Sequence, residues 1–127
     1  MSISLMMIVA MAAADPPPVP AAVQIIEENN VFVLRSADGA KPLYTFDRDV
    51  AGKSTCVDRC AIAWPALLAP AGARAFGGWT IVARADGSSQ WAFRGKPVYS
   101  FSHDANSKAS GDGMGGVWHL LPTTPSK

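Results

Sequence analysis

Short apolar stretches, each closed by a turn dipeptide, recur along most of the chain. Residues 31–35 (VFVLR) and 79–84 (WTIVAR) are rich in β-branched and aromatic side chains, which favour strands. Asp-Gly follows each stretch, at 38–39 and 86–87, and this dipeptide suits tight hairpin turns because both central positions need positive φ. The pattern predicts a mainly β domain of short antiparallel strands.

One nonapeptide occurs twice in the chain. KPLYTFDRD at 41–49 returns as KPVYSFSHD at 96–104, and each copy is followed by a Gly- and Ser-containing loop and then a tryptophan, Trp64 or Trp118. Two copies are too few for a solenoid. The repeat therefore predicts a small antiparallel β-domain of two pseudo-symmetric halves, each with an apolar face that the other half covers.

Within each copy, the two rings of an extended Tyr-x-Phe point to the same side, because side chains alternate along a strand. The closing aspartate stands where the strand ends, and there it can accept from backbone amides and shape a turn. A second interpretation makes Asp47, Asp49 and Asp104 carboxylate ligands of a hard cation such as calcium, or the acids of a hydrolase. The motif residues are Tyr44, Phe46, Asp49, Tyr99, Phe101 and Asp104, together with Trp64 and Trp118.

A single short helix is expected around residues 56–64. Thr55 is a good N-cap residue, Asp58 stands three positions later as in a capping box, and Pro65 ends the helix. So short a helix must be stabilised by docking against the rest of the domain.

The first residues predict export. ISLMMIVAMAAA is an apolar run that ends in an Ala-x-Ala pattern, as in a secretory signal peptide, and it is too short to span a bilayer. The prolines that follow predict a stiff linker. We expect a signal peptide at 1–14, a Pro-rich linker at 15–22, one β-domain at 23–122 with half-repeats at about 31–70 and 79–122, and a tail at 123–127.

Composition narrows the possible partners. The chain of 127 residues has 49% apolar and 17% charged residues and a formal net charge of +1. Such a balance provides no basic stripe for nucleic acid and no polybasic patch for anionic lipid. No transmembrane segment is expected in the mature chain.

Cys56 and Cys60 have two open interpretations. In an oxidising compartment they are expected to form a local disulfide that holds the Trp64 segment. Alternatively, thiolates select cuprous copper, and imidazole or thioether groups can complete such a site. The alternative copper ligands are Cys56, Cys60, His103, Met114 and His119.

The histidines and tryptophans add little chemistry of their own. His119 alternates with Trp118 and Leu120 in an expected strand, which predicts a surface or half-buried side chain. The four tryptophans, Trp64, Trp79, Trp91 and Trp118, either stack on carbohydrate or belong in part to the core.

The segments LYTFDRD, GKSTCVDRCAIAWPALLA, DGSSQWAFRGKPVYSF and GDGMGGVWHLLP together resemble the bacterial secreted-repeat lipoprotein family defined by a Tyr-x-aromatic-x-x-Asp motif. The resemblance covers residues 31–122. It implies an exported protein and the repeat, and it brings no established active site. The chain departs from the family in having no cysteine near the predicted cleavage point, where a lipoprotein would carry its lipid.

These observations predict an exported, non-catalytic binding or structural module of the periplasm or cell envelope. No nucleophile elbow, zinc signature or nucleotide fingerprint occurs in the sequence. The expected partner is an envelope protein or a small ligand, and no cofactor is expected. The alternative is a periplasmic copper-binding or thiol redox protein that uses the Cys56/Cys60 pair.

Overall fold

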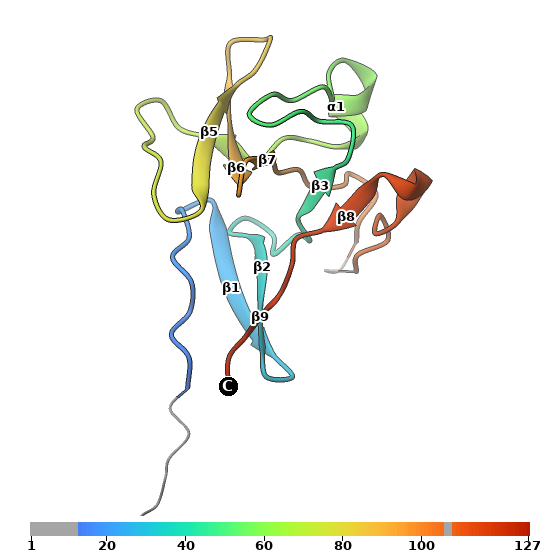
Figure 1. Cartoon of the computed structure of the whole chain (residues 1–127). Helices are drawn as coiled ribbons and strands as arrows, with labels where there is room; N and C mark the ends of the chain where they lie inside the picture. The colour runs from blue at the N-terminus through green and yellow to red at the C-terminus, as the bar shows by residue number, and fades with distance from the viewer. Residues whose placement is uncertain (1–12, 106–107) are drawn as a thin grey trace, which may run out of the picture.

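The computed structural model describes residues 13–105 and 108–127, and its folded part consists of two β-hairpins joined by a central region (Figure 1). The first hairpin pairs β1 (Val23–Glu28) with β2 (Val31–Ser36), and the second pairs β5 (Trp79–Ala83) with β6 (Ser89–Phe93). All named pairings are antiparallel, which confirms the predicted mainly β fold. The other elements are β3 (Tyr44–Phe46), α1 (Arg59–Ala63), β4 (Leu68–Ala69), β7 (Lys96–Pro97), η1 (Met114–Gly116), β8 (Trp118–Leu120) and β9 (Thr124–Pro125).

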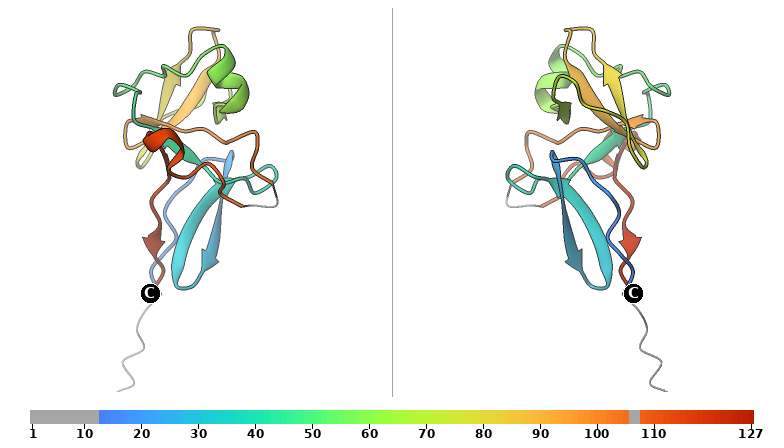
Figure 2. Two further views of the ribbon diagram at one scale, coloured as in Figure 1. Left: turned by 90° about the vertical axis from the view of Figure 1, so that its right-hand side faces the viewer. Right: turned by 90° about the vertical axis from the view of Figure 1, so that its left-hand side faces the viewer.

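Each hairpin is extended by a strand that comes from the other repeat. Strand β4, at the end of the first repeat, pairs with β6 of the second, and β9, which continues the second repeat into the segment predicted to be a tail, pairs with β2 of the first. Figure 2 shows β9, in red, beside the β1–β2 hairpin. The two repeats therefore exchange their last strands.

The exchange is centred on the motif tyrosines. Tyr44 and Tyr99 form an antiparallel bridge in which each backbone N–H donates to the other's carbonyl, at 2.8 and 2.9 Å. On either side, Tyr44 pairs with Leu120 and Tyr99 pairs with Ala66. Because equivalent residues of the two copies face each other here, an approximate two-fold axis passes between the two tyrosines.

Four aromatic rings form a continuous stack near this axis. Trp64 and Trp118 lie parallel, with ring centroids 3.7 Å apart and planes 2° apart. Phe46 stacks on Trp118 and Phe101 on Trp64, each at 4.1 Å. Each ring pair across the axis joins one repeat to the other, so neither half holds the whole stack.

A second buried cluster fills the space between the hairpins. Leu43 and Val98, the aliphatic residues at equivalent places in the two copies, are both fully buried. They pack with residues of both hairpins, including Val23, Leu34 and Trp79. The aliphatic position of the nonapeptide thus belongs to one core and its aromatic positions to the other.

The short helix exists, but its predicted N-cap is wrong. Helix α1 begins at Arg59, its N-cap residue Asp58 has a φ of 55°, and no side chain caps it. Thr55 instead donates from both its N–H and its hydroxyl to Oδ1 of Asp49, at 2.7 and 2.9 Å. A hydrogen bond to a charged carboxylate is stronger than one between neutral groups. Thr55 therefore bonds to the motif aspartate and does not cap the helix.

The segment before the first hairpin lies against the domain. The indole N–H of Trp79 donates to the carbonyl of Pro18 at 3.1 Å, and Pro20 is buried. The predicted signal peptide, residues 1–14, falls almost entirely outside the described residues. Within residues 13–105 and 108–127, no helix is long and apolar enough to cross a membrane.

Strand exchange predicts that neither repeat folds alone. Expressed as separate chains, residues 13–74 and 75–127 are each expected to lack stable tertiary structure, because an isolated two-stranded hairpin is at best marginally stable. Mixed in equal amounts, they are expected to recover the near-ultraviolet circular dichroism of the stacked tryptophans. A half that shows this signal without its partner would contradict the interdependence of the repeats.

Candidate functional site

Each motif tyrosine is hydrogen-bonded to the motif aspartate of the other repeat. The Tyr44 hydroxyl donates to Oδ2 of Asp104 at 2.6 Å, and the Tyr99 hydroxyl donates to Oδ2 of Asp49 at 2.7 Å. Both tyrosines are fully buried. The motif is thus a pair of reciprocal bonds across the axis rather than a unit that is complete within one copy.

The second oxygen of each aspartate organises a loop of its own repeat. Oδ1 of Asp49 accepts from Thr55, and Oδ1 of Asp104 accepts from the N–H and hydroxyl of Ser110, at 2.8 and 2.6 Å. In both cases the donor stands six positions after the aspartate. This matches the turn-shaping role that the sequence suggests for the aspartates, with the tyrosine bond as an addition.

Burial of the phenols and their bonds to carboxylates change how the tyrosines titrate. Burial, followed by the bond to Asp104, raises the pKa of Tyr44 well above its ordinary value. Burial raises the pKa of Tyr99 to about 12, and the Asp49 carboxylate adds to the rise. Both tyrosines are therefore held neutral as hydrogen-bond donors.

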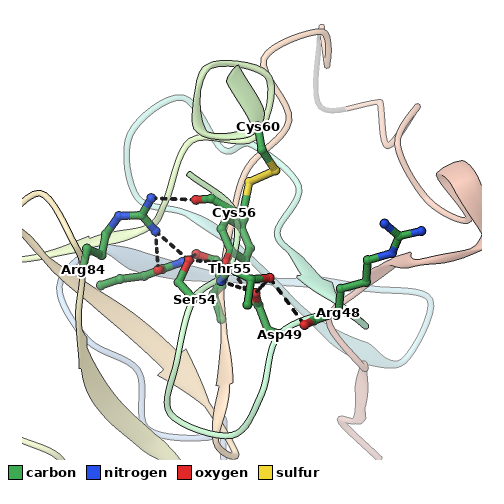
Figure 3. Close-up of a disulfide and its surroundings, with 10 residues drawn as sticks. Arg48, Asp49, Ser54, Thr55, Cys56, Cys60 and Arg84 are labelled. Carbon is green, nitrogen blue, oxygen red and sulfur yellow. Dashed lines mark hydrogen bonds between the residues drawn. A yellow bond between two sulfur atoms is a disulfide. The ribbon is translucent and has the colours of Figure 1, made fainter. Parts of the chain in front are cut away.

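The predicted disulfide is confirmed. Cys56 and Cys60 are joined, with their Cα atoms 5.1 Å apart, where the loop enters α1 (Figure 3). Arg84 reaches this loop from the second repeat and donates to the Cys56 carbonyl at 2.9 Å and to the Ser54 hydroxyl at 3.0 Å. Ser54 in turn lies 2.6 Å from the Tyr99 hydroxyl oxygen. The disulfide loop is thereby connected to the motif.

The second repeat has no room for an equivalent of Cys56. Gly111 takes the corresponding place after Ser110, and its N–H donates to the Tyr44 oxygen at 3.2 Å. A Cβ at Gly111 would lie 2.6 Å from a ring atom of Trp64. Close packing against the ring stack thus restricts the disulfide to one half of the domain.

Most of the other candidate site residues are buried or lie apart from one another in the structure. All four tryptophans are at most 5% exposed, so the carbohydrate platform considered from the sequence is wrong. Met114 is exposed on η1, and His103 lies with its ring 5.2 Å from that of Phe101. Among residues 13–105 and 108–127, no three His, Cys, Asp or Glu side chains come together as potential metal ligands.

One pair of candidates does come together, and no sequence pattern predicts their contact. His119 Nε2 lies 2.6 Å from Oδ2 of Asp47, with both side chains about half exposed, at 47% and 49%. The pair forms because β3 and β8 place Thr45 opposite His119. The exposed position predicted for His119 holds, but its partner is 72 positions away in the chain.

Two adjoining hollows flank this pair, and we call them together the Asp47 groove. They measure about 230 and 250 Å³, and both are lined by Asp47, Arg94 and Lys96. Asp49 and Val50 also line one hollow, and Thr45, His119 and Leu121 also line the other. The groove brings together charged residues from both repeats.

Comparison with known families agrees with this architecture. The model of a family described as a secreted repeat of unknown function matches residues 34–68 and again residues 80–121. The chain belongs to this family. The two matches give two secreted repeats in one chain, in agreement with the two-fold axis. Comparison with curated proteins and with solved structures gave no match.

Pseudo-symmetry separates what the secreted repeat needs from what this chain adds. Asp47 corresponds to Ser102 and His119 to Pro65, while the turn that corresponds to Arg94-Gly95 reads ADGA and carries no cation. The Tyr–Asp bonds occur in both halves, and so do Asp49 and Lys96, whereas Asp47, Arg94 and His119 occur in one half alone. The fold shared by both halves does not require them.

Because the chain has only two tyrosines, their titration reports on the motif alone. The folded pKa of Tyr99 lies near 12, above its unfolded value of 10.0, so the stability that the neutral phenol contributes is complete below pH 10 and is lost as the pH rises towards 12. Tyrosinate absorbance is expected to stay low through pH 10 and to rise together with loss of the circular dichroism signal.

The corresponding substitutions test the same bonds near neutral pH. Tyr44→Phe and Tyr99→Phe are each expected to lower the free energy of unfolding by about 1–3 kcal/mol, because a carboxylate loses a charge-assisted donor. Denaturant unfolding measures the change. For the parent protein, tyrosinate formation near pH 10 while the chain is still folded would contradict the reciprocal bonds.

Proposed function

We propose that the chain is an exported, non-catalytic binding module of the bacterial periplasm or cell envelope, and that the Asp47 groove holds its ligand. The observation that carries this proposal is the asymmetry between the repeats. The tyrosines, aspartates and stacked tryptophans of the motif recur in both halves, whereas Asp47, His119 and Arg94 do not recur. Charged residues gathered in a hollow without a structural need are typical of a binding site.

The state of the motif aspartates supports a binding role over a hydrolytic one. Asp49 and Asp104 each accept a tyrosine hydroxyl on one oxygen and a loop N–H and hydroxyl on the other. A general acid or base must exchange its proton with a substrate. Carboxylates so fully engaged in the fold are better suited to stabilising it.

The competing proposal is a copper or thiol redox protein. It would use Cys56 and Cys60 as thiolates, with His103, Met114 or His119 as further ligands. Both sulfur atoms are engaged in the disulfide, so this function would begin with reduction of the bond. Its reduced, metal-binding form is open to direct measurement.

Intact mass spectrometry of protein extracted from the periplasm, with thiol alkylation and added Cu(I), distinguishes these proposals. The expected product begins at Asp15 or Ala13, is two hydrogens lighter than the reduced chain, takes up no alkylating agent and retains no copper. Two free thiols that hold one copper ion would overturn the binding proposal in favour of metal handling.

Amide chemical shifts can test the groove itself. We expect at least one member of a defined panel to shift the amides of Arg94, Lys96 and His119 in a saturable way while those of Leu68 and Thr80 remain unchanged. The panel comprises a neutral disaccharide, a dipeptide, a diamine, acetate and inorganic phosphate. If no panel member moves these amides, the assignment of the groove as the binding site is wrong.

A further inference from the structure

The carboxylates of the Asp47 groove are paired or hydrogen-bonded, whereas its two cations have no carboxylate partner among the described residues. Asp47 is paired with His119, and Asp49 accepts from Tyr99 and Thr55. In the described part of the chain, neither Arg94 nor Lys96 lies within ion-pair distance of a carboxylate. Arg94 and Lys96 are therefore the charged groups of this groove that have no carboxylate partner among the described residues.

The local backbone fixes where these cations stand. Arg94 and Gly95 form the turn between β6 and β7, with φ values of 52° and 81°, and the Arg94 N–H donates to the Gly78 carbonyl at 2.7 Å. On the other side of the turn, the Gly52 N–H donates to the Gly95 carbonyl at 3.2 Å. The turn that carries Arg94 and leads into Lys96 is thus tied to two neighbouring loops.

The guanidinium group of Arg94 is also oriented. It lies 4.9 Å from the centroid of the Phe93 ring, a cation–π contact that limits its freedom. Both Arg94 and Lys96 line both hollows, so each hollow is bordered by two positively charged side chains. Arginine presents a planar fork of donors that matches carboxylate and phosphate oxygens.

We infer that the Asp47 groove binds an oxyanion, a carboxylate or a phosphate, between Arg94 and Lys96. This inference rests on the proposed binding function and adds the class of ligand. Hollows of about 230 and 250 Å³ are of the size that admits a small molecule or a single headgroup. Thr45 and His119 supply polar contacts for the remainder of the ligand.

Two variants separate the oxyanion site from folding. Arg94→Asn combined with Lys96→Gln removes both charges, and asparagine suits the positive φ of the turn, so the fold is expected to persist. The matched control is Lys41→Gln, because Lys41 occupies the same place in the first copy of the nonapeptide and lies outside the groove lining.

The test titrates the full mature chain with inorganic phosphate and with acetate, and follows the amides of Arg94, Gly95 and His119. A saturable shift is expected, together with weaker binding at higher ionic strength. The double variant is expected to bind roughly tenfold more weakly or worse, and Lys41→Gln to bind like the parent protein.

A second titration identifies the source of the oxyanion. Vesicles of phosphatidylcholine alone are compared with vesicles that also contain phosphatidylglycerol. Shifts with free phosphate or acetate indicate a small soluble anion, and shifts only with the anionic vesicles indicate a lipid headgroup. Loss of either effect in the double variant supports the inference.

Three results would overturn it. They are an absence of shifts with all three anionic probes, equal binding by the double variant, and equal loss in Lys41→Gln. If the neutral disaccharide or the diamine shifts the groove amides while the anions do not, the binding function stands and the oxyanion inference fails. If no probe of either kind reaches the groove, both fail.

Discussion

The reciprocal bonds from Tyr44 to Asp104 and from Tyr99 to Asp49 are the interaction on which the rest of this structure depends. Each bond buries a phenol at the two-fold axis and holds a carboxylate whose other oxygen shapes the next loop. That loop leads to the tryptophan of the same repeat, which stacks on the tryptophan of the other. One hydrogen bond in each direction therefore links strand, loop and ring stack.

This arrangement explains why the two copies of the nonapeptide keep the same residue types at several of their positions. The aliphatic residue fills the core between the hairpins, the tyrosine and phenylalanine meet the tryptophans, and the aspartate closes the bond to the partner repeat. A substitution at any of these positions therefore removes contacts with both halves. Positions free of this requirement, such as Asp47 and its counterpart Ser102, could diverge.

The β class, the two halves and the disulfide could be predicted because they depend on local patterns: turn dipeptides, a repeated segment and the spacing of Cys56 and Cys60. The exchange of strands could not, since a strand such as β4 carries the same pattern whichever hairpin it joins. The pattern predicts Thr55 as a helix cap because a threonine before a helix is a common cap, and the sequence does not show that Asp49, six positions earlier, accepts its N–H and hydroxyl. The contact between His119 and Asp47 could not be predicted from the sequence. The one indication is that the other repeat has Pro65 and Ser102 at the corresponding positions.

The exchange of last strands also determines the order in which structure can form during synthesis. When the first repeat has emerged, β2 lacks its neighbour β9, Tyr44 lacks Asp104, and Trp64 has no ring to stack on. These long-range contacts become available only when the C-terminal residues are present, and they close late. The contacts that complete the first repeat can therefore form only after the residues of the second repeat have been synthesised.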